Sequence, residues 1–375
     1  MIWVVVKLKK NDWQFNYSVG KFSIIIGSSY GTLMACRLFI GLAKLTSIEW
    51  FNKPIPAFFH LVLASWLLIF GYVNVAKASN TEFRISDLKL LLSWIVYPCS
   101  IVSGYYIYAE LLPLLGPTFS AYLVAMIFGL IVVTAFELII PYKQEWFPTK
   151  ADIKTDLIYM VVVQVLLPYF LSLVSLIGIE WVCRTKNFQV AIWPRELPLL
   201  LQVVLIILAA DFFRYWLHRT AHTWRPLWRF HAVHHSVEKL YWLNVGRFHP
   251  FEKTLQFLFE SFPFILLGAS QEVLSAYFIF YAINGFFQHS NVDVRLGWLN
   301  YIISGPELHR WHHSREIHES NSNYGNNVII WDILFGSFLF PRERSVDYLG
   351  LQYKSFPSGV LDQIKAPFFD EYYQR

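Results

Sequence analysis

The feature that most constrains the fold of this 375-residue chain is a series of long apolar segments. Each is near the length of about 20 residues that a helix needs to cross the hydrocarbon core of a membrane. Charged residues make up only 15% of the chain, whereas soluble domains carry roughly 25%. The sequence therefore predicts an all-α integral membrane protein, a multi-span helical bundle. The expected spans are residues 22–44, 55–76, 90–112, 119–141, 156–182 and 197–217.

A seventh apolar stretch, residues 254–288, is interrupted by Pro263, Gly268 and the polar run that starts at Ser270. These interruptions favour two shorter helices in a hairpin over one long span. Residues 289–375 are more polar and contain no further apolar run of 20 residues. We therefore expect the part after the hairpin to form a helical cap outside the membrane.

Basic residues in the loops indicate the orientation of the spans. Lysines cluster in the N-terminal 21 residues and again in 142–155, whereas 113–118 contains none. Lys and Arg are enriched in cytoplasmic loops. We therefore expect an uncleaved cytoplasmic N-terminus and a cytoplasmic location for the region that starts at His218. Arg184, Lys186 and Arg195 fall in a loop expected outside and oppose this orientation.

Histidine is concentrated in one part of the sequence, because eleven of the twelve lie between His218 and His318. An HxxxH pair at the end of the sixth span is followed by two HxxHH patterns, and on a helix residues four apart share a face. In HxxHH the imidazoles can also divide between two neighbouring ions. The patterns are His218/His222, His231/His234/His235 and His309/His312/His313, with His249 and His289 as single residues between them.

So many imidazoles beside membrane helices need polar partners, because an unpaired polar group in hydrocarbon costs several kcal/mol. Metal ions supply such partners, and eight to ten histidines suggest two of them. Cys36, Cys99 and Cys183 are too widely spaced for a disulfide framework or a CxxC zinc site. Neither Glu-x-x-His nor His-Glu-x-x-His occurs, which excludes the carboxylate-rich di-iron bundle and the common zinc-protease motif.

Two other classes of protein stay open at this point. A membrane metal transporter or storage protein would place its ligands near the membrane midplane, whereas these histidines cluster at helix ends and beyond. A zinc-dependent membrane hydrolase would need a general base, and the Glu of the metalloprotease motif is missing. The net charge of +5 is modest and no basic run is long enough for nucleic-acid binding, so we expect no nucleic acid partner.

The histidine motifs and their neighbours resemble the fatty acid hydroxylase / sterol desaturase superfamily. The branch with the greatest similarity is the bacterial sterol desaturase-like one, which is also similar to alkylglycerol monooxygenase. The resemblance covers roughly residues 150–340. It rests on His218-Arg-Thr-Ala-His222, Leu227-Trp-Arg-Phe-His-Ala-Val-His-His-Ser236, Arg247-Phe-His-Pro250, Gln288-His-Ser-Asn291, Glu307-Leu-His-Arg-Trp-His-His-Ser314, Asn321-Ser-Asn-Tyr-Gly325 and Trp331-Asp-Ile-Leu-Phe-Gly336.

The resemblance implies a non-haem di-iron oxygenase that uses O₂ and external electrons to hydroxylate or desaturate a C–H bond of a fatty acyl, sterol or related lipid. The cofactors would be two Fe ions, with O₂ as co-substrate. By matching position the metal ligands would be His218, His222, His231, His234, His235, His309, His312 and His313, with His289 as a ninth and His249 as a tenth.

The resemblance also implies the other partners. A haem motif of a fused cytochrome b5 is missing, so the electron donor would be a separate protein of the cytochrome b5, ferredoxin or reductase type. The alternative is an alkylglycerol-type ether-lipid monooxygenase. The long C-terminal membrane extension of that enzyme is not present, which argues against an ether lipid and a pterin cofactor.

Domain boundaries and supporting carboxylates complete the expectations. We expect N-terminal transmembrane helices in 1–150, a fatty acid hydroxylase-like catalytic domain in 151–340 and a cytoplasmic tail in 341–375. Asp211 and Asp293 either orient a ligand imidazole through its second nitrogen or simply line or cap a helix.

Overall fold

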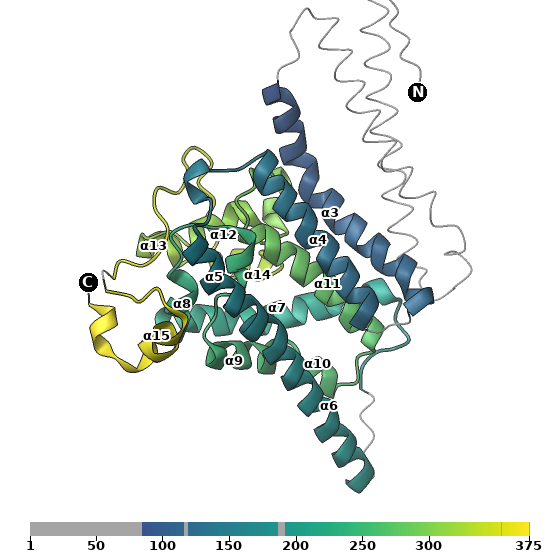
Figure 1. Ribbon diagram of the computed structural model, residues 1–375. Helices are drawn as coiled ribbons and strands as arrows, with labels where there is room; N and C mark the ends of the chain where they lie inside the picture. Colours follow the sequence, from purple (N-terminus) through teal and green to yellow (C-terminus); the bar gives the residue numbers. More distant parts are fainter. Residues whose placement is uncertain (1–84, 116–118, 187–191, 354, 375) are drawn as a thin grey trace, which may run out of the picture. The chain divides into compact units, whose positions relative to one another are not determined.

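The computed structural model describes residues 85–115, 119–186, 192–353 and 355–374 (Figure 1). The chain divides into two units, Met1–Leu92 and Ser93–Arg375, and the site described below lies in the second. The α-helices are α3 (Ile85–Leu115), α4 (Phe119–Ile139), α5 (Lys150–Ile158), α6 (Leu167–Lys186), α7 (Leu199–Thr223), α8 (Arg225–His235), α9 (Pro250–Glu260), α10 (Phe262–Leu266), α11 (Gln271–Gln288), α12 (Pro306–His312), α13 (Ile317–Ser320), α14 (Ile330–Phe335) and α15 (Val360–Lys365).

The other elements are short. The 3₁₀ turns are η2 (Gln144–Trp146), η4 (Trp242–Gly246), η5 (Gly297–Tyr301), η6 (Ala366–Phe368) and η7 (Asp370–Tyr373), and η3 (Tyr159–Leu166) is a π-helix. In the described part of the chain, β-structure is limited to isolated bridges such as Pro141–Val292. The prediction of an all-α fold is therefore confirmed for these residues.

Four helical segments are long and apolar enough to cross a membrane: Lys89–Ala109, Tyr122–Ile139, Lys150–Thr185 and Leu199–Thr223. They confirm the apolar spans predicted at 90–112, 119–141, 156–182 and 197–217. The two earlier predicted spans, 22–44 and 55–76, lie outside the described residues.

The third of these segments, of 36 residues, is longer than predicted, because α5, η3 and α6 follow one another without a break. It begins at Thr149, whose side chain accepts a hydrogen bond from the Asp152 backbone while the Asp152 carboxylate accepts one from the Thr149 backbone. This reciprocal pair satisfies two backbone donors that the helix itself leaves free. Farther along, large apolar side chains such as Ile177 and Trp181 are exposed, which suits a helix that faces lipid.

The stretch 254–288 is broken into α9, α10 and α11, one helix more than the predicted hairpin. Ser270 begins α11 by accepting a hydrogen bond from the Val273 backbone, and Pro263 lies in the first turn of the short α10. Helix α11 packs against α4 and α7 (Figure 1). The break thus lets the chain turn back and place the C-terminal end of α11 beside the histidine-bearing helices.

The region after α11 is a cap of short helices and loops, as the loss of apolar runs predicts. The loop 324–328 is tied to α7 by the Asp211 carboxylate, which accepts hydrogen bonds from the backbone of Asn327 and Val328. A side chain at Gly325 would place its Cβ 2.3 Å from the Val328 carbonyl oxygen. Glycine is therefore required for this loop to close next to Tyr324.

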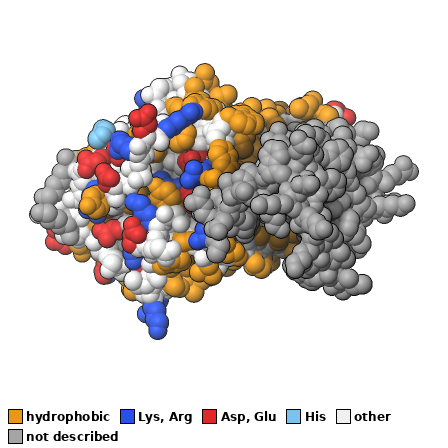
Figure 2. All heavy atoms as spheres, turned by 90° about the horizontal axis from the view of Figure 1, so that it is seen from above, with side chains coloured by type: hydrophobic (Ala, Val, Ile, Leu, Met, Phe, Trp, Pro, Cys, Tyr) orange, Lys and Arg blue, Asp and Glu red, His pale blue; other side chains and the backbone are white. Residues whose placement is uncertain are grey.

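On one face of the described structure, charged and hydrophobic side chains gather in different parts of the surface (Figure 2). Seen from above, Asp, Glu, Lys and Arg side chains gather over one end of this face, and hydrophobic side chains dominate the neighbouring surface (Figure 2). Such a division is expected of a protein that is partly embedded in lipid and partly exposed to water.

Candidate metal centre

Nine histidines converge from the C-terminal ends of four helices. His218 and His222 lie in the last two turns of α7, and His289 and His313 are the C-cap residues directly after α11 and α12. The remaining five lie within α8 and α12: His231, His234, His235, His309 and His312. The C-terminal end of a helix carries partial negative charge from its free carbonyl groups. Four such ends therefore favour a cation where they meet.

The first group, the five-histidine cluster, consists of His218, His222, His231, His235 and His312. Its ligand atoms all lie within 4.8 Å of one another, and only His222 is not fully buried. Four pairs of Nε2 atoms are in close contact. They are His218–His231 at 3.0 Å, and His222–His235, His231–His235 and His235–His312 at 3.1 Å.

The second group, the four-histidine cluster, consists of His234, His289, His309 and His313, and all four are buried. Nε2 of His309 lies 3.0 Å from Nε2 of His289 and 3.1 Å from Nε2 of His313. His289, a single residue in the sequence, is thus brought together with members of both HxxHH motifs. The two groups adjoin each other, because the rings of His235 and His313 are stacked with their centres 4.5 Å apart.

Each HxxHH motif is divided between the two clusters in the same way. The residues four apart stay together, so His231 and His235 share one cluster and His309 and His313 share the other. The middle residue crosses over, which puts His234 with the second motif and His312 with the first. Residues four apart differ by about 40° around a helix and adjacent residues by about 100°. The helix geometry therefore divides each HxxHH motif between two clusters, which is one of the arrangements that the sequence allowed.

Hydrogen bonds determine which ring nitrogen carries the proton. Nδ1 of His218 lies 2.8 Å from the Tyr324 carbonyl oxygen, and Nδ1 of His231 lies 2.7 Å from the Glu252 carboxylate. Both acceptors require a proton on Nδ1, so Nε2 of a neutral ring is left with a bare lone pair. The two Nε2 atoms nevertheless face each other at 3.0 Å. One added proton can bridge a single pair of Nε2 lone pairs. The five-histidine cluster has four such Nε2–Nε2 contacts, and one bound cation would satisfy all of them.

The spacing also suits a metal ion. Two nitrogens that bind one ion at about 2.1 Å and at right angles lie about 3.0 Å apart, whereas a tetrahedral arrangement separates them by about 3.4 Å. The observed contacts of 3.0–3.1 Å match the right-angled arrangement. The donor set therefore fits an ion with more than four ligands better than a tetrahedral structural zinc.

Burial keeps six of these imidazoles neutral, which is the form that binds metal. Burial, reinforced by His312 and Arg247, lowers the pKa of His289 to about 3, and burial with the nearby His231 does the same for His312. The pKa values of His234, His235, His309 and His313 are likewise far below 6.5, first because of burial and then because of the adjacent rings. A metal ion thus meets free lone pairs without competing against protons.

Three side chains to which the sequence assigned no role orient these rings. Glu252 accepts from His231, Asn244 lies 2.8 Å from Nδ1 of His289, and Asn321 lies 3.1 Å from Nδ1 of His222. Such partners select the tautomer and hold the ring in place. Glu252 follows three residues after His249, so the Arg-Phe-His-Pro motif pointed to the correct segment but to a different residue.

The carboxylates proposed for this role serve other purposes. Asp211 is fully buried, but its oxygens accept from the backbone and side chain of Asn327 and from the Val328 backbone. Asp293 is partly exposed and lies 3.8 Å from Arg295. Among the described residues, neither carboxylate contacts a histidine of the two clusters. Asp211 therefore does not orient a ligand imidazole and instead holds the loop 324–328 against α7.

His249 is not brought into either cluster. Its Nδ1 accepts from the Phe251 backbone at the start of α9, and its Nε2 lies 3.0 Å from the Ile364 carbonyl oxygen. Both nitrogens are engaged by backbone groups, and His249 thus joins α9 to the C-terminal segment. His318 has an exposed side chain next to Glu319, and His60 lies outside the described residues.

A cavity of about 400 Å³ reaches the histidines from the apolar helices. It is lined by α4, η3, α6, α7, α9 and α11, mostly with apolar side chains such as Met126, Leu130 and Phe278. His218, His234, His289 and His309 lie at its wall. Three of these four belong to the four-histidine cluster. The cavity therefore joins an apolar chamber to the two histidine clusters.

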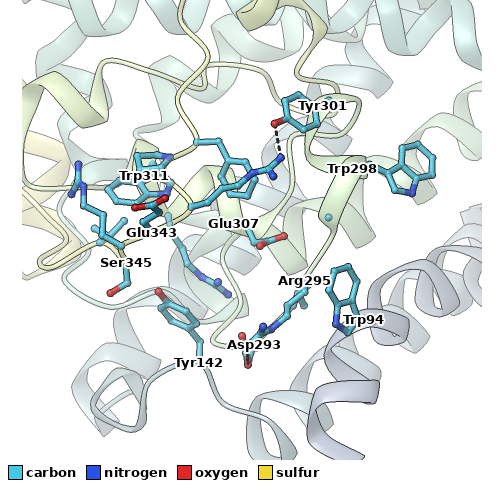
Figure 3. A pocket seen from close by; sticks show the side chains of 18 residues that line it. Trp94, Tyr142, Asp293, Arg295, Trp298, Tyr301, Glu307, Trp311, Glu343 and Ser345 are labelled. Atoms are coloured by element: carbon cyan, nitrogen blue, oxygen red, sulfur yellow. Dashed lines mark hydrogen bonds and ion pairs between the residues drawn. The ribbon is translucent and has the colours of Figure 1, made fainter. Parts of the chain in front are cut away.

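A second hollow, of about 690 Å³, lies beside α12. None of the nine clustered histidines lines it. Figure 3 shows Tyr142, Tyr301 and Trp311 around it, with the hydrogen bond from an arginine, Arg342, to the Tyr301 hydroxyl. Arg310 donates to the Val292 carbonyl and stacks on the Tyr142 ring. These contacts hold α12, and with it three of the histidines, in position.

Comparisons with known proteins agree with this geometry. The sequence model described as fatty acid hydroxylase matches residues 203–337, which include all nine clustered histidines. Ornithine lipid hydroxylase OlsE of Rhizobium tropici is 35% identical over 240 residues, which are 63% of this chain and 72% of that protein. No solved structure matches the chain.

Two other kinds of relative match shorter segments. Alkylglycerol monooxygenase of Homo sapiens is 32% identical over 161 residues, and the chain spans 35% of its length. Very-long-chain aldehyde decarbonylase GL1-8 of Oryza sativa subsp. japonica is 28% identical over 142 residues, which are 51% of that protein. The chain, which carries four helices suited to spanning a membrane, belongs to the fatty acid hydroxylase family of lipid-modifying oxidoreductases.

Proposed function

We propose that this protein is a membrane-bound di-iron oxygenase that uses O₂ and external electrons to hydroxylate or desaturate a C–H bond of a lipid. One observation carries the proposal. Two adjoining clusters of histidines, all buried except His222, lie at the wall of an apolar cavity that is formed by membrane-spanning helices. This arrangement combines a donor set for two ions with a chamber for a hydrocarbon chain.

We propose one ion in each cluster. His218, His222, His231, His235 and His312 hold one, and His234, His289, His309 and His313 hold the other. Imidazole is a ligand for Zn, Cu, Fe and Ni, and the family resemblance selects iron. The four-histidine cluster offers fewer ligands and lines more of the cavity, so we propose that its ion lies nearer to the substrate.

When bound, a pair of iron ions supplies the capacity to reduce O₂ and oxidise an unactivated C–H bond. The protein's own residues bind and orient. Glu252 and the carbonyl groups of Tyr324 and Ser322 hold the imidazoles in one tautomer, and apolar side chains of the cavity exclude water and align the chain. Hydroxylation and desaturation then differ only in how the substrate lies in the cavity.

An alkylglycerol-type ether-lipid monooxygenase is the second candidate. It is favoured by matches at 28–34% identity to alkylglycerol monooxygenases of four animals. The two candidates differ in their lipid and in the need for a pterin, so turnover of an alkylglycerol that requires added pterin distinguishes them.

The remaining proposals concern orientation and organisation. We propose that the histidine clusters face the cytoplasm and that a separate protein of the cytochrome b5, ferredoxin or reductase type delivers electrons there. We propose 151–340 as the catalytic segment, preceded by transmembrane helices and followed by a cytoplasmic segment. In the described structure this last segment packs back on α8 through η6.

The test is to purify the full chain from iron-replete cells, count its metals, and supply O₂, a reductase system and a membrane lipid extract. We expect about two irons per chain and a lipid product that requires O₂. Replacement of His234 by Ala should abolish the product and leave the protein in the membrane fraction. Zinc as the bound metal, or turnover without O₂, contradicts the proposal.

A further inference from the structure

The apolar cavity contains buried charged side chains that the metal centre does not use. Arg214, Lys253 and Glu260 all line it, and their exposed fractions are only 3%, 5% and 4%. Arg214 lies in α7, within a segment long and apolar enough to cross a membrane, one turn before His218. An ionisable residue at such a place indicates a functional site, because its burial is costly.

Their positions direct all three charges to one place. Lys253 and Glu260 are seven residues apart on α9 and therefore share a helix face. The Arg214 guanidinium and the Lys253 ammonium lie over the same ring, that of Phe248, at 5.7 and 5.6 Å from its centre. Phe248 in turn stacks on His234 with ring centres 4.0 Å apart. The charged group thus lies one aromatic ring away from the four-histidine cluster.

The protein satisfies these charges only in part, and the side-chain hydrogen bond that Glu260 accepts is a long one, 3.5 Å from the Tyr277 hydroxyl to Oε1. Nε of Arg214 and Oε2 of Glu260 are 3.7 Å apart, and neither has a hydrogen-bond partner among the described residues. Lys253 has only long contacts, 3.2 Å to the Tyr281 hydroxyl and 3.4 Å to Gln256. A buried ion pair is stable only when its remaining donors and acceptors are also paired. The open positions are therefore suited to a ligand.

The signs of the charges specify what kind of ligand. Arg214 and Lys253 offer donors to an anionic oxygen group, whereas Glu260 offers an acceptor to a cation. Resting on the proposed oxygenase function, we propose that Arg214, Lys253 and Glu260 bind the polar end of the lipid substrate, and that this end carries an anionic oxygen group together with an ammonium group.

This placement has a consequence for the position of the reaction. Residues four apart on a helix are separated by about 6 Å along its axis, so Arg214 holds the polar end about one turn from His218. The apolar side chains of α4 and α6 are left for the hydrocarbon tail. The oxidised carbon is therefore close to the polar end of the lipid, rather than near the end of the acyl chain.

The test uses equilibrium binding to the purified full chain without O₂, so that turnover is not needed. Four probes share a 12-carbon tail: N-lauroyl-lysine, N-lauroyl-norleucine, lauroyl lysophosphatidylethanolamine and 1-dodecylglycerol. We expect one of the two probes with both charges to bind at least about tenfold more tightly than dodecylglycerol. The tighter of them shows whether the anionic group is a carboxylate or a phosphate.

Variants assign the effect to residues. Glu260→Gln should remove the preference for N-lauroyl-lysine over N-lauroyl-norleucine, which lacks only the ammonium. Arg214→Gln should weaken the binding of both N-lauroyl-lysine and N-lauroyl-norleucine by about tenfold and leave the binding of dodecylglycerol unchanged. Arg214→Lys replaces it if the glutamine variant does not fold. Arg225→Gln, which changes an exposed arginine paired with Asp370, is the matched control and should have no effect.

Equal affinity of the wild-type protein for all four probes overturns the inference, as does a preference that survives both the Arg214 and the Glu260 replacement. The proposed function fails separately, through the absence of an O₂-dependent product from a protein that still discriminates the probes. Metal content, measured on each variant, shows whether an altered affinity arises at the charged group or from loss of the adjacent histidine clusters.

Discussion

Nδ1 of His231 donates a hydrogen bond of 2.7 Å to the Glu252 carboxylate, and both side chains are buried. The carboxylate is held in turn by Gln256. His231 contacts two other members of the five-histidine cluster, so this one bond orients the centre of that cluster. The contact to His231 also lowers the pKa of Glu252, which keeps the carboxylate charged despite its burial.

Replacing Glu252 by Gln should therefore weaken metal binding at the five-histidine cluster by about 10- to 100-fold. The amide keeps the shape but loses the charge that stabilises the proton on Nδ1. Metal titration of the chelator-treated protein measures the change. Glu238→Gln, at an exposed carboxylate, is the control, and equal affinities of the two variants would refute the role of Glu252.

His289 and His249 make a matched pair that tests the ligand assignment. His289→Ala should reduce the metal content from about two ions per chain toward one, because it removes one of four ligands. His249→Ala should keep both ions and instead lower the stability by about 1 kcal/mol, the typical cost of losing the side chain that caps a helix. Metal analysis and thermal unfolding of both variants decide, and the reverse pattern would show that His249 is the ligand.

The metal-free protein should be sensitive to acid. In the folded chain burial lowers the pKa of His289 and His312 to about 3, whereas an exposed histidine titrates near 6.5. The unfolded chain therefore binds more protons between about pH 6.5 and pH 3, so stability is present above this range and is lost as the pH falls through it. We expect the Tm of the chelator-treated protein to fall between pH 7.5 and 5.5. A Tm independent of pH would contradict the buried, neutral state of these rings.

Lys253 should make head-group binding dependent on pH. Burial lowers its pKa to about 8, opposed by Glu260 and Glu252 and assisted by Arg214; the Tyr281 hydroxyl also faces it. The ammonium is present below this value and is lost as the pH rises through it. Affinity for N-lauroyl-norleucine, whose carboxylate stays ionised, should decline from pH 7 to 9 in the wild-type protein. In the Lys253→Met variant this affinity should be low and independent of pH. A parallel decline in the wild-type protein and the variant would show that Lys253 does not bind the head group.

Much of the metal centre follows from local sequence. The spacing of four residues in His218/His222, His231/His235 and His309/His313 sets which imidazoles share a face, because the helix period is the same in any fold. The apolar runs likewise predict the spans that the structure describes, because lipid requires uninterrupted helices. For His289 a single histidine carried no periodicity, and only the family resemblance pointed to it.

Other features depend on contacts between segments far apart in the chain. Glu252 and Asp211 are both buried acids, and which of them meets a histidine depends on how α9 and α7 pack against the cap. His249 lies in a motif that carries the family resemblance, yet its nitrogens are taken by the Phe251 and Ile364 backbone. The ion pair between Arg214 and Glu260 connects residues that are 46 positions apart in the chain.

The sequence by itself thus determined the helices, their apolar faces and the pairs of histidines that point together, since these depend on the local period of the backbone. Only the tertiary structure decided which pairs meet at one cluster, which acid orients them, and where the cavity places its charges. The physical reason is that metal ligation, ring orientation and ion pairing act over about 3 Å between side chains, and such distances are set by helix packing rather than by position along the chain.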